Sequence, residues 1–198
     1  MTTIHIGRRL RWALLAVCAA CCTFGVARSA SVPIDAQASK LTVRVFKSGI
    51  FSPFAHNHEI QAPLAEGVVD TSALSVDLRI ESHAMRILDP KASDQERSKV
   101  QAVMEGPKVL DVARFPLIRF HSTTIAASGA ESWSVEGTLE LHGESRPIRF
   151  EVRREGGLYR GTAALRQTEF GIKPVKIAGG TVRVKNDVRV EFEIALGS

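Results

Sequence analysis

The chain has 198 residues, enough for one domain with a sizeable core, and 44% of them are hydrophobic. Its formal net charge is +5. Four of the 26 basic residues (Arg8, Arg9, Arg11, Arg28) and none of the 21 acidic ones precede residue 31. Residues 31–198 therefore carry 22 basic and 21 acidic residues, a net charge of +1. This composition excludes the concentrated basic surface that nucleic-acid binding requires.

Residues 1–30 are predicted to be a secretory signal peptide. Three arginines precede an apolar run over residues 12–20, and small residues near Ala27 and Ser29 offer cleavage sites. The run falls short of the roughly 20 residues that span a bilayer, so we expect a mature chain without a membrane span. An uncleaved anchor, lipid attachment at Cys21 and twin-arginine export are weaker alternatives.

All three cysteines, Cys18, Cys21 and Cys22, lie in this leader. The mature chain is therefore expected to contain no disulfide and no catalytic thiol, so that its core must supply the stability. No linker, charge block or internal repeat divides residues 31–198, which we expect to form one domain.

The first half of the mature chain predicts four strands followed by a helix. Apolar residues alternate with polar ones over residues 41–46, 56–61, 67–70 and 74–81, which is the period of half-buried strands. His56, His58 and Ile60 share one face of the second of these. Ser93 and Glu96 then form a capping box, and the helix that it begins is expected to stop at Gly106-Pro107.

The second half predicts further strands over residues 115–122, 133–141, 148–152 and 158–167, with a hairpin turn at residues 142–145. A last long strand is expected to begin at Gly179-Gly180 and to run to Leu196. Eight to ten such strands with a single helix indicate a closed antiparallel barrel or a sandwich. A barrel of about eight strands is either filled by side chains or encloses one apolar ligand. The small residues Gly161, Ala163 and Ala164 favour a hollow interior.

Motifs of catalysis are absent from the sequence. It contains no Gly-x-Ser-x-Gly elbow, phosphate loop, dinucleotide fingerprint or His-Glu-x-x-His helix, so we expect neither an enzyme nor a cofactor.

His56 and His58 point the same way on a strand and are placed to share a metal ion, but the sequence supplies no third ligand. The simpler interpretation makes them polar residues at the barrel rim. Lys173 and Lys176 flank a turn where they are placed to meet an anionic head group.

Several short motifs carry a family resemblance. They are Phe115-Pro116-x-Ile118-x-Phe120-x-Ser122, Gly137-x-Leu139-x-Leu141-His142-Gly143, Arg146-Pro147 and Thr168-Glu169-Phe170-Gly171-Ile172. In order and spacing, over about residues 34–196, the chain resembles the YceI-like family of polyisoprenoid-binding proteins. The resemblance implies a lipocalin-like extended antiparallel β-barrel, all-β apart from one short helix, whose hydrophobic interior takes a long polyisoprenoid chain in the bacterial periplasm. The chain departs from better-known members at His56-Asn57-His58, which leaves the ligand open.

The alternation and the resemblance together predict the ligand site. Its apolar wall is expected to comprise Val43, Val45, Ile60, Leu78, Ile118, Phe120, Leu139, Leu141, Phe150, Phe170, Ile172 and Phe192, and its mouth His56, His58, Lys173 and Lys176. We expect it to bind a polyisoprenoid or other apolar lipid without catalysis. A metal protein or hydrolase that uses His56 and His58, and a structural or stress-related barrel without ligand, are the alternatives. The sequence does not decide whether the protein forms a homodimer.

Overall fold

The computed structural model of the protein describes residues 31–48, 57–177 and 182–197. Within these residues it contains strands β1 (Ser31–Ser48), β2 (His58–Gln61), β3 (Leu64–Asp70), β4 (Ser75–Glu81), β5 (Arg86–Ile87), β6 (Leu117–Gly129), β7 (Ser132–Leu141), β8 (Glu144–Glu155), β9 (Leu158–Arg166), β10 (Lys176–Ile177) and β11 (Val182–Leu196). The helices are α1 (Asp94–Glu105) and the 3₁₀ turns η2 (Ser82–Ala84) and η3 (Gln167–Phe170).

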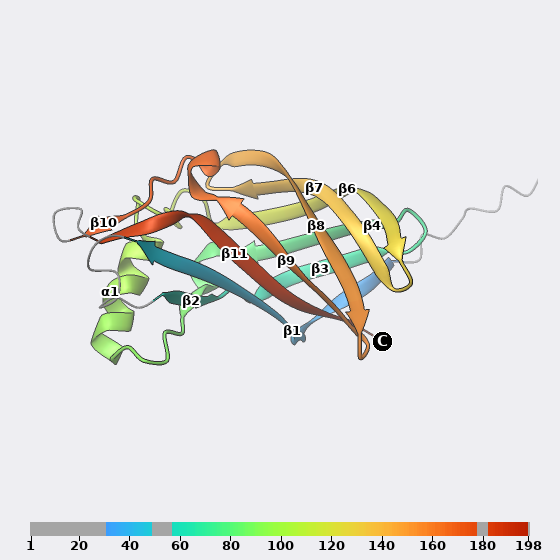
Figure 1. Cartoon of the computed structure of the whole chain (residues 1–198), viewed down its shortest axis with the longest axis horizontal. Helices are drawn as coiled ribbons and strands as arrows, with labels where there is room; N and C mark the ends of the chain where they lie inside the picture. Colours follow the sequence, from blue (N-terminus) through green and yellow to red (C-terminus); the bar gives the residue numbers. More distant parts are fainter. Residues whose placement is uncertain (1–30, 49–56, 178–181, 198) are drawn as a thin grey trace, which may run out of the picture.

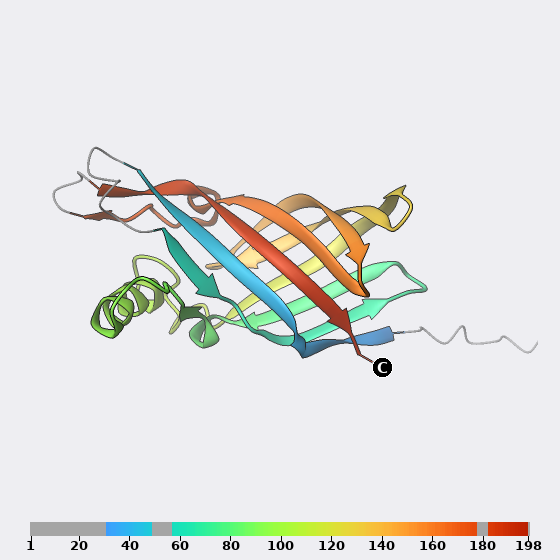
Figure 2. The same ribbon diagram turned by 60° about the horizontal axis from the view of Figure 1, so that its bottom comes forward.

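Eight of the strands close into an antiparallel barrel. Each neighbour in the series β1, β11, β9, β8, β7, β6, β4, β3 pairs with the next, and β3 returns to β1 (Figures 1 and 2). The barrel predicted from the alternating pattern is thereby confirmed, and the sandwich alternative is wrong. Closure leaves these eight strands without a free edge along most of their length.

Strand register places the apolar faces together. Phe120 lies opposite Leu139, and Val135 opposite Phe150, so the inward positions of three consecutive strands are in phase. The turn between β7 and β8 has two residues, His142 and Gly143, both with positive φ (54° and 77°). This is the backbone that two-residue hairpins favour, and it makes the turn shorter than the four residues expected.

Strand β1 is longer than its sequence indicates. The alternation predicts a start at Leu41, but the strand begins at Ser31 and includes Pro33 near its start, where the missing amide costs little. Its first residues pair with β3, and after a register shift between Asp35 and Lys40 its second half pairs with β2. The first half is a strand, although its sequence does not alternate regularly, because β3 and β11 supply its hydrogen bonds.

Helix α1 covers one end of the barrel. Its capping box is as predicted: the Ser93 side chain accepts from the Glu96 amide, and the Glu96 carboxylate accepts from the Ser93 amide at 2.8 Å. The Gln101 amide group binds the backbone at β5, donating to the carbonyl of Met85 just before the strand and accepting from the Ile87 amide within it. No helix in the residues that the structure describes has the length and apolarity needed to cross a bilayer.

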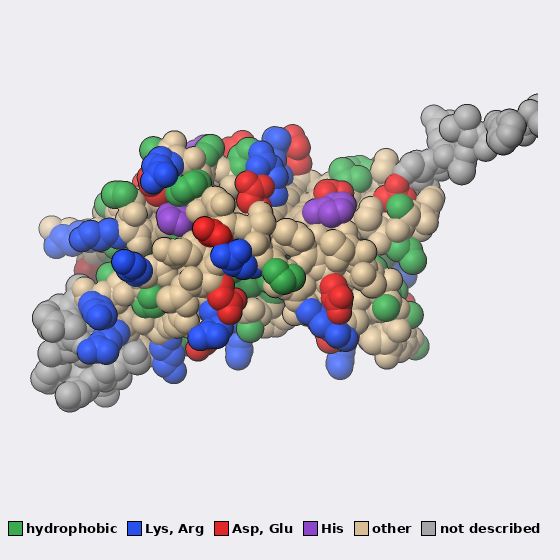
Figure 3. Space-filling view, turned by 90° about the horizontal axis from the view of Figure 1, so that it is seen from above, with side chains coloured by type: hydrophobic (Ala, Val, Ile, Leu, Met, Phe, Trp, Pro, Cys, Tyr) green, Lys and Arg blue, Asp and Glu red, His purple; other side chains and the backbone are tan. Residues whose placement is uncertain are grey.

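The two ends of the barrel differ. We call the end with α1, η3 and β10 the helix end, and the end with the turns β3–β4, β6–β7 and β8–β9 the hairpin end (Figure 1). On the face seen in Figure 3, basic and acidic side chains are interspersed. The exterior also carries ion pairs such as Arg149–Glu136 at 3.1 Å. The hydrogen bond from Arg44 to Glu191 raises the pKa of that guanidinium. Exposed pairs of this kind contribute little stability but keep the surface polar.

Candidate functional site

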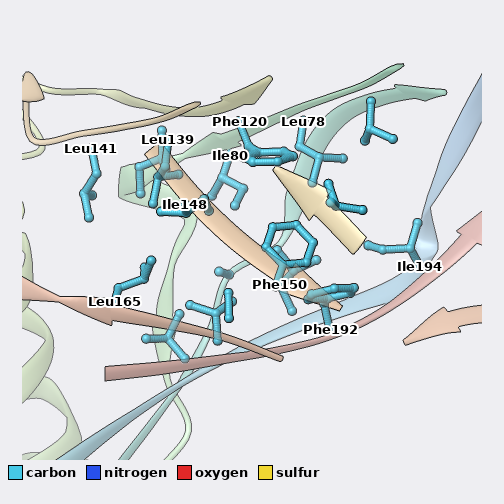
Figure 4. Close-up of a pocket in the computed structure, with 18 of the residues that line it drawn as sticks. Leu78, Ile80, Phe120, Leu139, Leu141, Ile148, Phe150, Leu165, Phe192 and Ile194 are labelled. Carbon is cyan, nitrogen blue, oxygen red and sulfur yellow. The ribbon is translucent and has the colours of Figure 1, made fainter. Parts of the chain in front are cut away.

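A central cavity of about 400 Å³ runs through the barrel interior. Its lining side chains come from all eight barrel strands and from the segments at both ends, and all of them are apolar or aromatic except Asp70, Thr71 and Gln167. Figure 4 shows inward-pointing side chains from opposite walls, among them Leu78, Leu139 and Leu165, facing one another across it. The volume lies in the range of pockets that hold small organic ligands, roughly 300–1,000 Å³.

The predicted wall residues lie on this cavity with one exception. Those that line it are Val43, Val45, Ile60, Leu78, Ile118, Phe120, Leu139, Leu141, Phe150, Ile172 and Phe192. Phe170 does not: it is 1% exposed and packs within the core. The reason is local, because Phe170 ends the 3₁₀ turn η3, where side chains do not follow the alternation of a strand. That these residues bind a ligand remains a prediction.

Three aromatic rings in contact with one another line the middle of the cavity. The ring centroid of Phe150 lies 5.5 Å from that of Phe120 and 5.4 Å from that of Phe192, in tilted and edge-on arrangements that aromatic pairs favour (Figure 4). Phe120 lies over Gly137 on the neighbouring strand, where a Cβ would come within 2.5 Å of its ring. The glycine thus lets the ring lie against the wall rather than across the cavity.

The small residues of β9 have different roles from those predicted. Ala163 faces inward, is buried and lines the cavity, as expected. Gly161 faces the same way, but the ring of Phe192 occupies the space beside it. Ala164 points outward and is exposed, so its inclusion among the residues that leave a hollow is wrong.

Among the described residues, the lining side chains are buried at the helix end and exposed at the hairpin end. At the helix end its lining side chains, Met85, Met104 and Ile172, are about 5% exposed or less. At the other end the lining includes Thr71 and Leu74 in the β3–β4 turn, both exposed, Leu74 to 58%. The described residues therefore place an opening at the β3–β4 turn.

The predicted mouth residues lie elsewhere. Lys173, on the segment before β10, and Lys176, the first residue of β10, are exposed at the helix end, and neither lines the cavity. His58 does not line it either, and His56 lies outside the described residues. Placing these residues at the mouth assumed that it lies beside the turn after Phe170. The described lining side chains at that end are buried instead.

His58 is held by a buried carboxylate. Its Nδ1 lies 2.5 Å from Oδ2 of Asp89, which is 4% exposed, and Oδ1 of Asp89 accepts the backbone N–H of Glu59 at 2.7 Å. Among the described residues there is no group of three or more histidine, cysteine or acidic side chains arranged to hold a metal ion. The pair joins β2 to the segment before α1. No sequence signal could have found it, since the partners are 31 positions apart.

Lys47 lies near this pair at the helix end. Burial lowers the pKa of its ammonium group, and the nearby negative charge of Asp89 only partly opposes that effect. The backbone N–H of Lys47 donates to the Asn57 side chain at 3.3 Å, next to His58. The polar residues of the helix end therefore form a structural cluster outside the cavity.

Comparison with known proteins agrees with this architecture. Residues 33–196 match the model of the YceI-like domain. A UPF0312 protein of Pseudomonas savastanoi pv. phaseolicola is 38% identical over 94 residues, 42% of this chain and 47% of that protein. A UPF0312 protein of Pseudomonas putida strain W619 is 28% identical over 138 residues, 65% of each chain. The chain thus spans about half to two thirds of the length of these curated relatives.

Solved structures share the fold at low sequence identity. BcnA of Burkholderia cenocepacia superposes with a TM-score of 0.58 at 16% identity, covering 83% of this chain and 99% of that one. A mutant YceI protein of Campylobacter jejuni, solved with a monobromobimane guest, gives a TM-score of 0.51 at 11% identity over 77% of this chain and 84% of its own. Identities this low support the barrel fold alone.

Proposed function

Because the chain belongs to the YceI-like domain family, we propose that its barrel binds an apolar lipid, a polyisoprenoid or another long hydrocarbon chain, in the central cavity and without catalysis. One observation carries the proposal: the cavity of about 400 Å³ has an almost entirely apolar lining. An apolar cavity of about 150 Å³ is already enough to stay dry and take up benzene in another protein.

The energetics favour a hydrocarbon ligand. Each methylene group moved from water into such a cavity contributes about 0.8 kcal/mol, so a long chain gains affinity without any polar contact. The rings of Phe120, Phe150 and Phe192 offer additional dispersion contacts near the middle of the cavity. Binding of this kind needs no nucleophile, acid or metal, in keeping with a sequence that carries no catalytic motif.

We further propose that the protein works in the periplasm as a carrier or store. The basic and apolar character of residues 1–30, which lie outside the described residues, supports a cleaved signal peptide. The mature domain is then residues 31–198. A carrier there would shield a water-insoluble chain between membranes, and the polar exterior of the barrel suits that task.

Native mass spectrometry of protein purified gently from its host, without detergent or organic solvent, tests the proposal. We expect a complex heavier than the chain by the mass of one lipid, which dissociates on collisional activation. A metal mass in place of a lipid mass would support the histidine-dependent alternative. A folded protein with neither mass, which also fails to take up an added isoprenoid alcohol, would support a structural barrel and contradict the proposal.

A further inference from the structure

The charge of the cavity lining limits the head group of its ligand. Among the described residues no lysine, arginine or histidine lines the cavity. Among these described lining residues the one carboxyl group, that of Asp70, has the same sign of charge as an anionic head group, and Thr71, Tyr159 and Gln167 carry uncharged polar groups. A carboxylate or phosphate on the ligand would therefore meet no cation among the described lining residues, and beside Asp70 it would face a group of like charge, which is unfavourable.

The polar lining is concentrated at the opening. Asp70 and Thr71 lie at the β3–β4 turn, where Leu74 forms an exposed apolar lip. Gln167, toward the helix end, already donates its side-chain amide to the Lys185 carbonyl at 2.8 Å. The deep end is otherwise apolar. An amphiphile that enters at the turn would therefore place its tail toward the helix end and its head beside Asp70 and Thr71.

We propose that the ligand enters tail first at the β3–β4 turn and that the cavity selects a neutral head group, such as an alcohol, over an anionic one of equal chain length. This inference rests on the proposed function, since it concerns the same cavity. It goes further by naming the opening and the class of head group. The exposed Lys173 and Lys176 do not offset the missing charge, because they lie before and at the start of β10, outside the lining.

A matched pair of ligands tests the selectivity. Dodecanol and dodecanoate share a chain length, and each can be titrated into the full protein by calorimetry at mildly alkaline pH, where the acid is ionised. We expect dodecanol to bind about tenfold more tightly or better, because dodecanoate loses part of its hydration without gaining an ion pair. Equal or tighter binding of dodecanoate would overturn the inference while leaving lipid binding intact. Failure of both ligands to bind would overturn the proposed function as well.

A matched pair of variants tests the opening. Thr71→Lys places a cation in the cavity lining at the turn, whereas Ser72→Lys adds the same charge one residue away, outside the lining. Both positions are exposed, so both variants are expected to fold. Thr71→Lys should raise the affinity for dodecanoate several-fold and leave that for dodecanol unchanged, and Ser72→Lys should do much less. Equal effects of the two lysines on dodecanoate, or no effect of either, would overturn the assignment of the opening.

Discussion

The ring of Phe192 on β11 lies against the backbone of Gly161 on β9, its cross-strand neighbour. A Cβ at position 161 would come within 2.4 Å of Cζ of Phe192 and within 2.5 Å of the Glu151 carbonyl oxygen on the other side. Glycine at this position therefore keeps the ring on the wall of the cavity. A similar contact joins Phe120 and Gly137, which lie on adjacent strands without being direct partners, on the far side of Phe150.

Gly161→Ala is expected to destabilise the protein by about 1–3 kcal/mol and to weaken lipid binding, because the added methyl group forces Phe192 toward the cavity and strains the strand. Chemical denaturation measures the first effect and ligand titration the second. Thr162→Ala, at the exposed neighbouring position, is the control and should change stability by about 0.5 kcal/mol or less. A Gly161→Ala variant as stable as the parent would show that the contact is not tight.

Asp89→Ala should cost about 2–3 kcal/mol of unfolding free energy, because it removes the acceptor of the partly buried Glu59 amide and the partner of His58. Asp89→Asn keeps an oxygen for the amide and should cost less. Denaturation of the two variants side by side checks the order. If both variants match the parent, the carboxylate does not hold β2 to the segment before α1.

Stability should rise with pH in the alkaline range below 10.5, the ordinary pKa of a lysine, because of Lys47. Burial lowers the pKa of Lys47 in the folded state, so between the folded and unfolded values the unfolded chain binds more protons, and raising the pH favours folding. Lys47→Met removes this contribution. Compared by denaturation across that window, the parent should gain more stability than Lys47→Met, with the exposed Lys40→Met as control. Parallel curves for parent and Lys47→Met would contradict the prediction.

Dialysed protein is expected to retain no stoichiometric zinc or copper. His58 already engages Asp89, and the described residues bring no set of three ligands together. Elemental analysis after dialysis, repeated after a zinc or copper load, measures retention. Tight binding that is lost in His58→Ala or His56→Ala but kept in His121→Ala, a change at an exposed histidine, would revive the metal alternative.

The sequence is informative about the fold because one period governs most of the chain. Alternation alone identifies the inward positions of the long strands, such as Ile118 and Phe120, and the capping box identifies α1. Alternation fails in two places: the first half of β1 does not alternate regularly and is a strand through its neighbours, and β5 has only two residues. Single-sequence patterns do not report such tertiary pairing.

The candidate site could be predicted only in part. The wall follows from alternation, so all but Phe170 of its predicted residues line the cavity. The opening depends on which end the chain closes, and this is decided by contacts between distant segments, such as Gln101 with Met85. Whether glycine leaves a void likewise depends on a neighbouring strand, as the ring of Phe192 beside Gly161 illustrates.

The most direct test of lipid binding compares two variants of adjacent residues on β9. Ala163→Phe fills the central cavity from its wall, whereas Ala164→Phe adds the same ring to the exterior. Calorimetric titration of geranylgeraniol into both, with folding verified by circular dichroism, is the measurement. We expect Ala163→Phe to lose about tenfold or more in affinity and Ala164→Phe to keep that of the parent. Equal affinity of the two folded variants would contradict binding inside the barrel.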